Sequence, residues 1–527
     1  MTEQNHNNEP HYDFASSLLP AILIIVALFI ILFVTLNPFD FQFRRLTISE
    51  YLSAYDLPPS SAIDFPQNIL LFLPFGFGIA AVLERRSWSK NHIQLAVLIS
   101  GFLLTLLVES LQQFLSTRQP SVADLIANTL GALAGLACYR LWQSNRVSMQ
   151  RLGRTITVPR NVMAALAVYV PILLLMAYRL STSTHFQEWD PEFSMLVGNE
   201  QTADRPWQGS LGDLLIFDRV LGEREAHDLL ENPRLALSGR EDLLAYYPLG
   251  GDRATADLSG NQPDLVWQPP SAGGSDDPSR NLDGDNWLES LTAVSNLTQR
   301  LLETSQLSLR LSVSTGDLEQ GGPARIVSIS EDPYLRNLTL GQEENDLVLR
   351  YRSRLTGENG IRPQFSFPAF FTSSDSTNFV VTVDCLNILL FDARSDTVRS
   401  LRLVPGVAFY YKYLHPIFGG ESALGQVRVT PFSNWAYGLL FYAVVLLPIA
   451  MIMALPSVQT WPGRRRLMLL LVGLLVIPIL LEFALALGCS HSPRLLDIFT
   501  SIFVEFVVFA ALRPFLYHLL DYSGSDR

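Results

Sequence analysis

The sequence predicts an α-helical polytopic membrane bundle of about eight transmembrane helices, into which an all-β sandwich domain is inserted. Two observations lead to this fold class. The 527 residues are 48% hydrophobic and only 17% charged, with a mean hydropathy of +0.22, which is too apolar for a soluble protein of this length. The long apolar segments also fall into two clusters, separated by a block of short apolar runs and turn residues.

The membrane segments follow from their length, because an α-helix needs roughly 20 apolar residues to cross a bilayer core about 30 Å thick. Eight segments approach this length: residues 17–36, 68–84, 93–115, 122–142, 160–180, 435–455, 466–487 and 496–518. The first lacks the basic flank and the cleavage site of a signal peptide, so we expect it to be retained. The predicted domains are residues 1–180, with five membrane helices, 181–430, the β domain, and 431–527, with three more helices.

Basic residues in the short loops predict the orientation, because cytoplasmic loops of membrane proteins hold an excess of Lys and Arg. The loops on one side hold eleven such residues between Arg85 and Arg466. The opposite short loops hold four, which are Arg44, Arg45, Arg118 and Arg494. We therefore expect both termini in the cytoplasm and residues 181–430 outside it.

The charge distribution argues against nucleic acid as a partner. Residues 181–430 contain 20 basic and 35 acidic residues, and the rest of the chain contains 18 and 15, whereas nucleic-acid binding needs a clustered basic face. The three cysteines, Cys138, Cys385 and Cys489, show neither metal-ligand spacing nor the pattern of a disulfide framework. We expect no redox chemistry.

Residues 181–430 alternate short apolar runs with Gly, Pro, Asn and Asp turns, which is typical of a two-sheet sandwich. Residues 207–221, with Trp207 and the run Asp213-Leu214-Leu215-Ile216-Phe217, followed by a short helix over 223–230, resemble a late part of laminin-G-like or concanavalin-A-like jelly-roll domains. Residues 244–249 resemble the opening strand of such domains. Because the late part comes first, a circular permutation and a truncated tandem pair both remain open.

This resemblance implies contact with a cell-wall or surface glycan or with an envelope protein, although a fold alone does not establish an activity. Some of these domains bind calcium, and acidic residues in Gly-rich turns could be ligands, but such residues more often accept backbone hydrogen bonds. The candidates are Asp252, Asp257, Asp283 and Asp285. Three tryptophans could stack on sugars or form core: Trp207, Trp267 and Trp287. No other cofactor is expected.

Polar residues also lie at membrane depth around the predicted turn between the third and fourth helices. The candidate ligand-binding residues there are Glu109, Gln112, Gln113, Arg118, Asp124 and Asn128. Glu109 lies about six residues, or roughly 9 Å, inside the end of its helix. A carboxylate at that depth costs a few kcal/mol unless it is paired or faces a water-filled cavity. A functional pocket and a structural polar clasp are the alternatives. For Asp124, a further alternative is a capping box with Ser121.

Three motifs in order characterise this part of the chain: Asn68-Ile69-Leu70-Leu71-Phe72-Leu73-Pro74-Phe75-Gly76, then Glu109 to Arg118, then Asp124-Leu125-Ile126-Ala127-Asn128-Thr129-Leu130-Gly131. With them, residues 35–142 resemble the VanZ-like membrane family, which is linked to tolerance of glycopeptide antibiotics that bind cell-wall precursors. The resemblance implies an integral protein of a bacterial plasma membrane and adds Asn68 to the candidate ligand-binding residues. Gly131 and Gly135 form a small-xxx-small face suited to close helix packing.

The last two predicted helices repeat part of this pattern. An offset of 373 residues places Glu482 on Glu109 and Asp497 on Asp124 without a gap. The possible second-copy site consists of Glu482, Asp497, Ser501 and Glu505. If real, the repeat is parallel, because both copies cross the membrane in the same direction.

Three functions fit these observations. The first is a cell-envelope protein whose bundle binds a lipid or lipid-linked glycan head group at the external polar site, while the β domain contacts glycan or a partner. The second is a head-group-modifying enzyme with Glu109 and Asp124 as general acid and base, although no nucleophile–base pair, phosphate loop or metal cluster accompanies them. The third is a membrane anchor that displays an adhesive domain.

Overall fold

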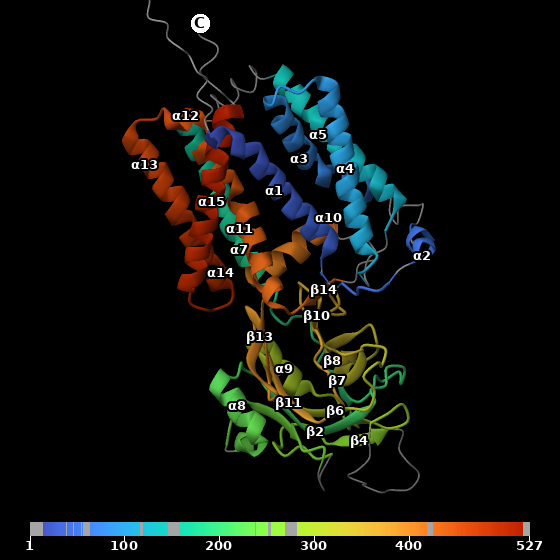
Figure 1. The fold of residues 1–527 in the computed structure, drawn as a ribbon. Helices are drawn as coiled ribbons and strands as arrows, with labels where there is room; N and C mark the ends of the chain where they lie inside the picture. The colour runs from blue at the N-terminus through green and yellow to red at the C-terminus, as the bar shows by residue number, and fades with distance from the viewer. Residues whose placement is uncertain are drawn as a thin grey trace, which may run out of the picture.

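The computed structural model describes residues 14–37, 39, 41–45, 47–53, 55, 64–115, 120–145, 158–237, 239–250, 255–268, 282–418 and 425–519. In this part of the chain the long helices form one bundle, and the strands, together with two short helices, form a second body beside one end of it (Figure 1). Seven helices are long and apolar enough to cross a membrane, and two β-sheets make up the inserted domain. The predicted fold class is therefore confirmed.

The bundle contains helices from both ends of the chain. Their bounds are α1 (Phe14–Leu36), α3 (Asp64–Arg85), α4 (Lys90–Gln112), α5 (Val122–Ser144), α7 (Pro159–Ser181), α11 (Pro431–Ala454), α13 (Gly463–Leu471), η4 (Val472–Val476), α14 (Ile477–Gly488) and α15 (Leu495–Leu519). The α13, η4 and α14 segments form one span, Gly463–Gly488. Short helices α2 (Ile48–Ser53) and α12 (Pro456–Gln459) lie in the connections. Within α1, Leu23–Leu36 form an apolar helical stretch that is shorter than the seven spans.

Small residues bring α3 and α5 into backbone contact. A Cβ atom on Gly135 would lie 2.2 Å from the Leu73 carbonyl oxygen, and one on Gly131 would lie 2.5 Å from that of Ile69. No larger residue fits at these positions without separating the helices, so the predicted small-xxx-small face is the α3–α5 contact.

The helix limits follow the 373-residue offset found in the sequence. α4 and α5 begin at Lys90 and Val122, and the corresponding helices begin at Gly463 and Leu495. α3 packs chiefly against α5, and α11 packs chiefly against α15. α3 and α11 also each contain an internal proline. An internal proline is not specific to this pair, because α7 and α15 also contain one.

The β domain consists of two sheets. Strand order is β14-β10-β9-β8-β7-β1-β5-β4 in one and β13-β12-β11-β6-β2-β3 in the other. The strands are β1 (Ser194–Val197), β2 (Gly209–Phe217), β3 (Leu243–Tyr247), β4 (Leu265–Gln268), β5 (Trp287–Ser290), β6 (Leu307–Thr315), β7 (Ala324–Ser330), β8 (Arg336–Glu343), β9 (Asp346–Tyr351), β10 (Gln364–Phe367), β11 (Thr377–Val383), β12 (Asn387–Asp392), β13 (Ser395–Arg402) and β14 (Gln426–Arg428). Neighbours pair antiparallel except β10 and β14.

The two sheets share one apolar core, which makes the domain a sandwich. Leu338 and Leu340 of the first sheet and Leu309 and Leu311 of the second belong to the same buried cluster. α8 (Glu223–Glu231) covers the opposite face of the six-stranded sheet. α9 (Ser295–Thr304) and a short 3-10 turn, η1 (Pro233–Leu237), complete the domain.

The segment between β13 and β14 is largely helical, with extended backbone at Val404, although the sequence pattern placed it within the β block. It consists of η2 (Leu403–Val407), η3 (Tyr410–Leu414) and α10 (His415–Phe418). The reason is aromatic packing on the bundle: the Tyr410 ring lies 5.6 Å from that of Phe33 and 5.4 Å from that of Tyr437, between ring centroids.

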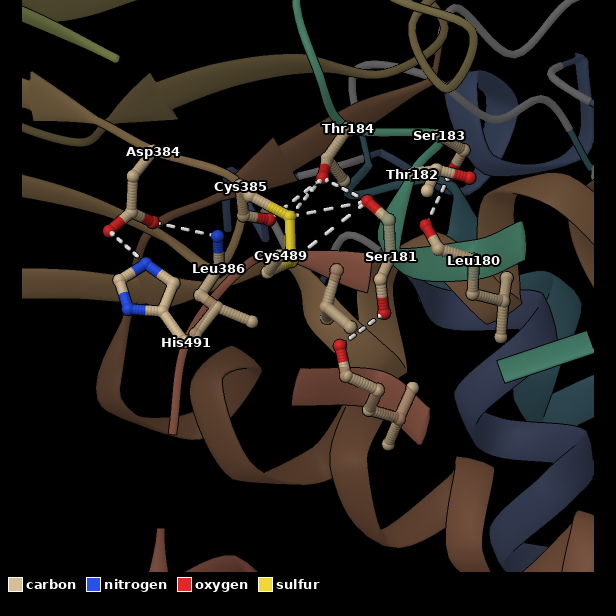
Figure 2. Close-up of a disulfide and its surroundings, with 12 residues drawn as sticks. Leu180, Ser181, Thr182, Ser183, Thr184, Asp384, Cys385, Leu386, Cys489 and His491 are labelled. Atoms are coloured by element: carbon tan, nitrogen blue, oxygen red, sulfur yellow. Dashed lines mark hydrogen bonds and ion pairs between the residues drawn. A yellow bond between two sulfur atoms is a disulfide. The ribbon is translucent and has the colours of Figure 1, made fainter. Parts of the chain in front are cut away.

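A disulfide between Cys385 and Cys489 joins the sandwich to the bundle (Figure 2). Cys385 lies in the turn between β11 and β12, and Cys489 directly follows α14, with 5.5 Å between their Cα atoms. The expectation that the cysteines form no disulfide is therefore wrong. Sequence spacing could not reveal the pair, because its members lie 104 residues apart on two different structural bodies.

Candidate functional site

Glu109 is buried near the end of α4, and its carboxylate contacts the start of α5. Its side chain is 1% exposed, and its Oε2 accepts a hydrogen bond of 2.9 Å from the Ser121 backbone N–H. Ser121 is the N-cap residue of α5, whose side chain accepts a hydrogen bond from the Ala123 N–H. The carboxylate thus ties the end of one membrane helix to the start of the next.

Asp124 links α5 to α3. It lies in the first turn of α5, where the helix dipole favours an acidic residue. Its Oδ1 accepts a hydrogen bond of 2.7 Å from the amide nitrogen of Asn68. The Asn68 contact, which is not a capping interaction, gives this carboxylate a role between helices. The predicted residues Asn68, Glu109 and Asp124, which come from three helices, therefore meet at the first turn of α5.

The three remaining amides of the predicted site contact different neighbours. Gln112 donates to the Thr35 carbonyl oxygen of α1 at 3.0 Å, Gln113 donates to the Tyr51 carbonyl oxygen at 3.3 Å, and Asn128 donates to the Thr105 hydroxyl at 2.9 Å. Oε1 of Gln113 and Oδ1 of Asn128 are buried without a hydrogen-bond partner in the described chain. Arg118 lies outside the described residues.

Sequence reasoning missed two tyrosines beside this site. The Tyr51 hydroxyl lies 2.7 Å from the Ser110 hydroxyl and 3.1 Å from that of Tyr55. α2 brings Tyr51 to α4 across 59 residues of sequence. The i, i+4 spacing of the two tyrosines was the one available signal, but it did not show which helix they meet.

The four second-copy residues lie on α14 and α15, and the sandwich approaches one of them. Glu482 is 3% exposed, and Ser501 and Glu505 are fully buried. Asp497 forms a 2.5 Å ion pair with Arg402, at the end of β13. Sequence reasoning missed Arg402 because it lies 95 residues away, in another domain. Both carboxylate oxygens of Glu505 lack a partner among the described residues.

The acidic turn residues of the sandwich mainly hold their own turns. Asp257 accepts hydrogen bonds from the backbone N–H groups of Tyr246, Ser259, Asn261 and Gln262. Asp283 accepts from the Asp285 N–H and the Asn286 amide. Asp252 lies outside the described residues. In the described chain, the one group of three potential metal ligands in close reach is His185, Cys385 and Cys489, whose sulfur atoms are joined.

The tryptophans differ in their exposure. Trp207 is completely buried and donates a 2.9 Å hydrogen bond to Gln342, so it is a core residue and its interpretation as a sugar platform is wrong. Trp267 and Trp287 are half-buried on the β4–β5 hairpin.

A pocket of about 500 Å³ lies where the bundle meets the sandwich. It is lined by Phe33, Asn37, Phe39, Phe41, Pro368, Arg428, Thr430, Phe432, Ser433 and Tyr437. The Asn37 amide donates a 2.6 Å hydrogen bond to the Tyr437 hydroxyl and so connects α1 with α11. Aromatic walls with a few polar groups can accept an amphipathic molecule.

Comparison with known proteins identifies one part of the chain. Residues 15–143 match the VanZ/LLP1 family. No curated protein and no solved structure matches the chain. The matched region contains α1, α3, α4 and α5 together with Asn68, Glu109 and Asp124. Over residues 15–143, this multi-pass membrane protein is therefore similar to the VanZ/LLP1 family.

Proposed function

We propose that the protein is a cell-envelope membrane protein that binds a lipid or lipid-linked glycan head group at the outer end of α3, α4 and α5. The observation that carries this proposal is the meeting of Asn68, Glu109 and Asp124 around one helix turn. Buried polar groups at membrane depth are expensive, and membrane proteins place them where ligands bind.

The orientation is part of the proposal: both termini in the cytoplasm, the sandwich and the polar site outside. The loop charges support it, and so does the disulfide between Cys385 and Cys489, because disulfides persist in oxidising compartments. A compartment-sensitive reporter fused after residue 180 should report an external position. A cytoplasmic signal there would reverse the orientation.

The junction pocket supports an amphipathic ligand. α1 and the residue after it connect this pocket with the polar site at α3, α4 and α5, because the Thr35 carbonyl oxygen accepts the Gln112 hydrogen bond and Asn37 lines the pocket. The aromatic walls suit an acyl or prenyl chain, and the polar turn suits a head group. We infer that the sandwich, which resembles laminin-G-like domains, contacts glycan or an envelope protein on the same side.

The competing interpretation is that Glu109 is only a structural clasp, which its bond to the Ser121 N–H favours. The test compares lipids that copurify with the wild type and with Glu109→Gln, at equal abundance, by mass spectrometry. The matched control is Glu84→Gln, at the other end of α3. A lipid-linked sugar lost only from Glu109→Gln supports the proposal, and identical lipid profiles contradict it.

A further inference from the structure

The eight-stranded sheet turns one face to the apolar core and presents the other as a polar face rich in arginine. Strand register places Ser328 opposite Thr339, and Thr339 opposite Arg350. Their neighbours along the strands, Ile329 and Leu338, point into the core, and side chains alternate between faces. Ser328, Thr339 and Arg350 therefore share the polar face.

Two more arginines belong to this face. Strand register places Arg336 opposite Ser330, and the Ser330 hydroxyl lies 2.7 Å from that of Ser328. Arg325 forms a 3.1 Å ion pair with Glu200, and Glu200 also accepts a hydrogen bond from Ser330. The turn that follows β1 supplies Glu200. We call Arg325, Arg336 and Arg350 the arginine face.

The three guanidinium groups are almost entirely removed from water. Their residues are 1%, 3% and 8% exposed, respectively. Arg350 donates to the neutral amide oxygen of Gln364, at 2.8 Å from its Nε. Nε and Nη1 of Arg336 are buried and have no hydrogen-bond partner among the residues that the structure describes. Of the three, only Arg325 forms an ion pair with a carboxylate within the described part of the chain.

This arrangement is electrostatically incomplete. Burial and the charge of Arg325 lower the pKa of Arg336 to about 10, and burial with the charges of Arg325 and Arg336 lowers the pKa of Arg350 to about 9. Both groups remain charged near neutral pH. Glu200 and then Asp332 attract Arg336, and Glu343 attracts Arg350, but none of these carboxylates forms an ion pair with either arginine among the described residues. A buried charge without a partner is strongly destabilising, so a compensating anion is favoured.

We infer that the arginine face binds an oxyanion, either a free phosphate or an anionic group carried by a sugar. The unpartnered Nε and Nη1 of Arg336 supply two buried, charged donors, to which oxygens of a phosphate or carboxylate can bind. Ser328, Ser330 and Thr339 add hydroxyl groups on the same face. This site is separate from the polar turn of α3, α4 and α5, so it can fail while the proposed lipid site stands, and the reverse.

The test is thermal unfolding of the full-length protein in detergent, with inorganic phosphate replacing chloride at constant ionic strength. Saturating phosphate should raise the Tm of the wild type by about 2–4 °C, because a ligand that binds only the folded state stabilises it. Arg336→Gln should lose this response. Arg224→Gln, which removes an exposed arginine of α8, should keep it.

If Arg336→Gln does not fold, the response of the wild-type Tm to the anions tests the inference without the variant. Glucose 6-phosphate and glucuronate, with glucose as the neutral control, distinguish the sources of the anion. A larger response to the charged sugars than to phosphate assigns a sugar-borne group, and a response to phosphate alone assigns a free ion. A wild-type Tm that ignores all three anions would overturn the inference, as would a Tm of Arg336→Gln that still rises with phosphate.

Discussion

At the residue scale, side-chain hydrogen bonds between helices define the candidate site. Asn68 reaches Asp124 from α3, and Glu109 reaches the Ser121 N–H from α4. These contacts join three helices at the first turn of α5. Each contact includes a carboxylate, and hydrogen bonds to charged groups are stronger than neutral ones.

Asn68→Ala should therefore lower the free energy of unfolding by about 1.5–3 kcal/mol, because it leaves Asp124 without this donor. Asn91→Ala, at an exposed position of α4, should have little effect. In a double-mutant cycle with Asp124→Asn, the two changes should be non-additive by at least about 0.5 kcal/mol. Additive effects would show that the hydrogen bond between them contributes nothing.

A second residue-scale prediction concerns acid stability of the sandwich. Burial opposes ionisation of Asp242, but hydrogen bonds from Arg240 and Arg219 outweigh it and lower its pKa to about 2. Because the folded pKa lies below the unfolded value, this carboxylate stabilises the fold above pH 4 and loses that effect between about pH 4 and pH 2. Asp242→Asn should reduce Tm at pH 7, and the difference from wild type should vanish near pH 2. A difference that persists there would exclude this linkage.

Much of the residue-scale site was predictable from the sequence. Glu109 and Asp124 were selected as polar groups at membrane depth, and Asn68 was added by the VanZ-like resemblance. Tyr51 and Arg402 were not, because neither carries a signal at its own position. Their importance arises from contacts with Ser110 and Asp497, 59 and 95 residues away in sequence.

At the element scale, helix contact through glycine holds the VanZ-like part together. Gly131 and Gly135 of α5 lie against carbonyl oxygens of α3. Their spacing of four residues was readable in the sequence, since it places both on one helix face. The largely helical segment from Leu403 to Phe418 could not be predicted from the sequence, because its Tyr and Val residues also favour strands. Its helical conformation depends on packing against the bundle.

Gly135→Ala should separate α3 and α5 and cost about 1–3 kcal/mol of stability, because its Cβ atom would overlap the Leu73 carbonyl. Gly438→Ala, on α11, is the matched control. No heavy atom lies within 4 Å of its added Cβ, and alanine favours helix, so this variant should be neutral or slightly stabilised. Equal stability of both variants in detergent would contradict the close α3–α5 contact.

At the scale of the whole molecule, the sandwich and the bundle are one connected structure. They are joined by the Cys385–Cys489 disulfide, the Arg402–Asp497 ion pair and the aromatic packing of Tyr410. Beside the same bridge, the Thr184 hydroxyl donates to the Cys385 carbonyl oxygen (Figure 2). Within the bundle, the Ser181 hydroxyl donates to the Leu485 carbonyl oxygen. The sequence predicted both bodies but not this joint, because every contact in it is distant along the chain.

Cys385→Ser should lower the Tm by several degrees, because the bridge closes a loop of 104 residues, and cross-links of that length contribute roughly 4–5 kcal/mol in the chain-entropy model. Reducing agent should destabilise the wild type equally and leave Cys385→Ser unchanged. Cys138→Ser, which removes the free thiol of α5, should retain the sensitivity to reductant. Alkylation of all three cysteines without reductant would show that the bridge is absent.

The most direct test of the central claim is a titration of the purified protein with a polyprenyl-linked sugar, followed by native mass spectrometry. We expect the wild type and Glu84→Gln to bind with equal affinity, and Glu109→Gln and Asp124→Asn to bind at least about tenfold more weakly, which corresponds to about 1.4 kcal/mol. Equal affinity of all four proteins would contradict a head-group site at the outer end of α3, α4 and α5.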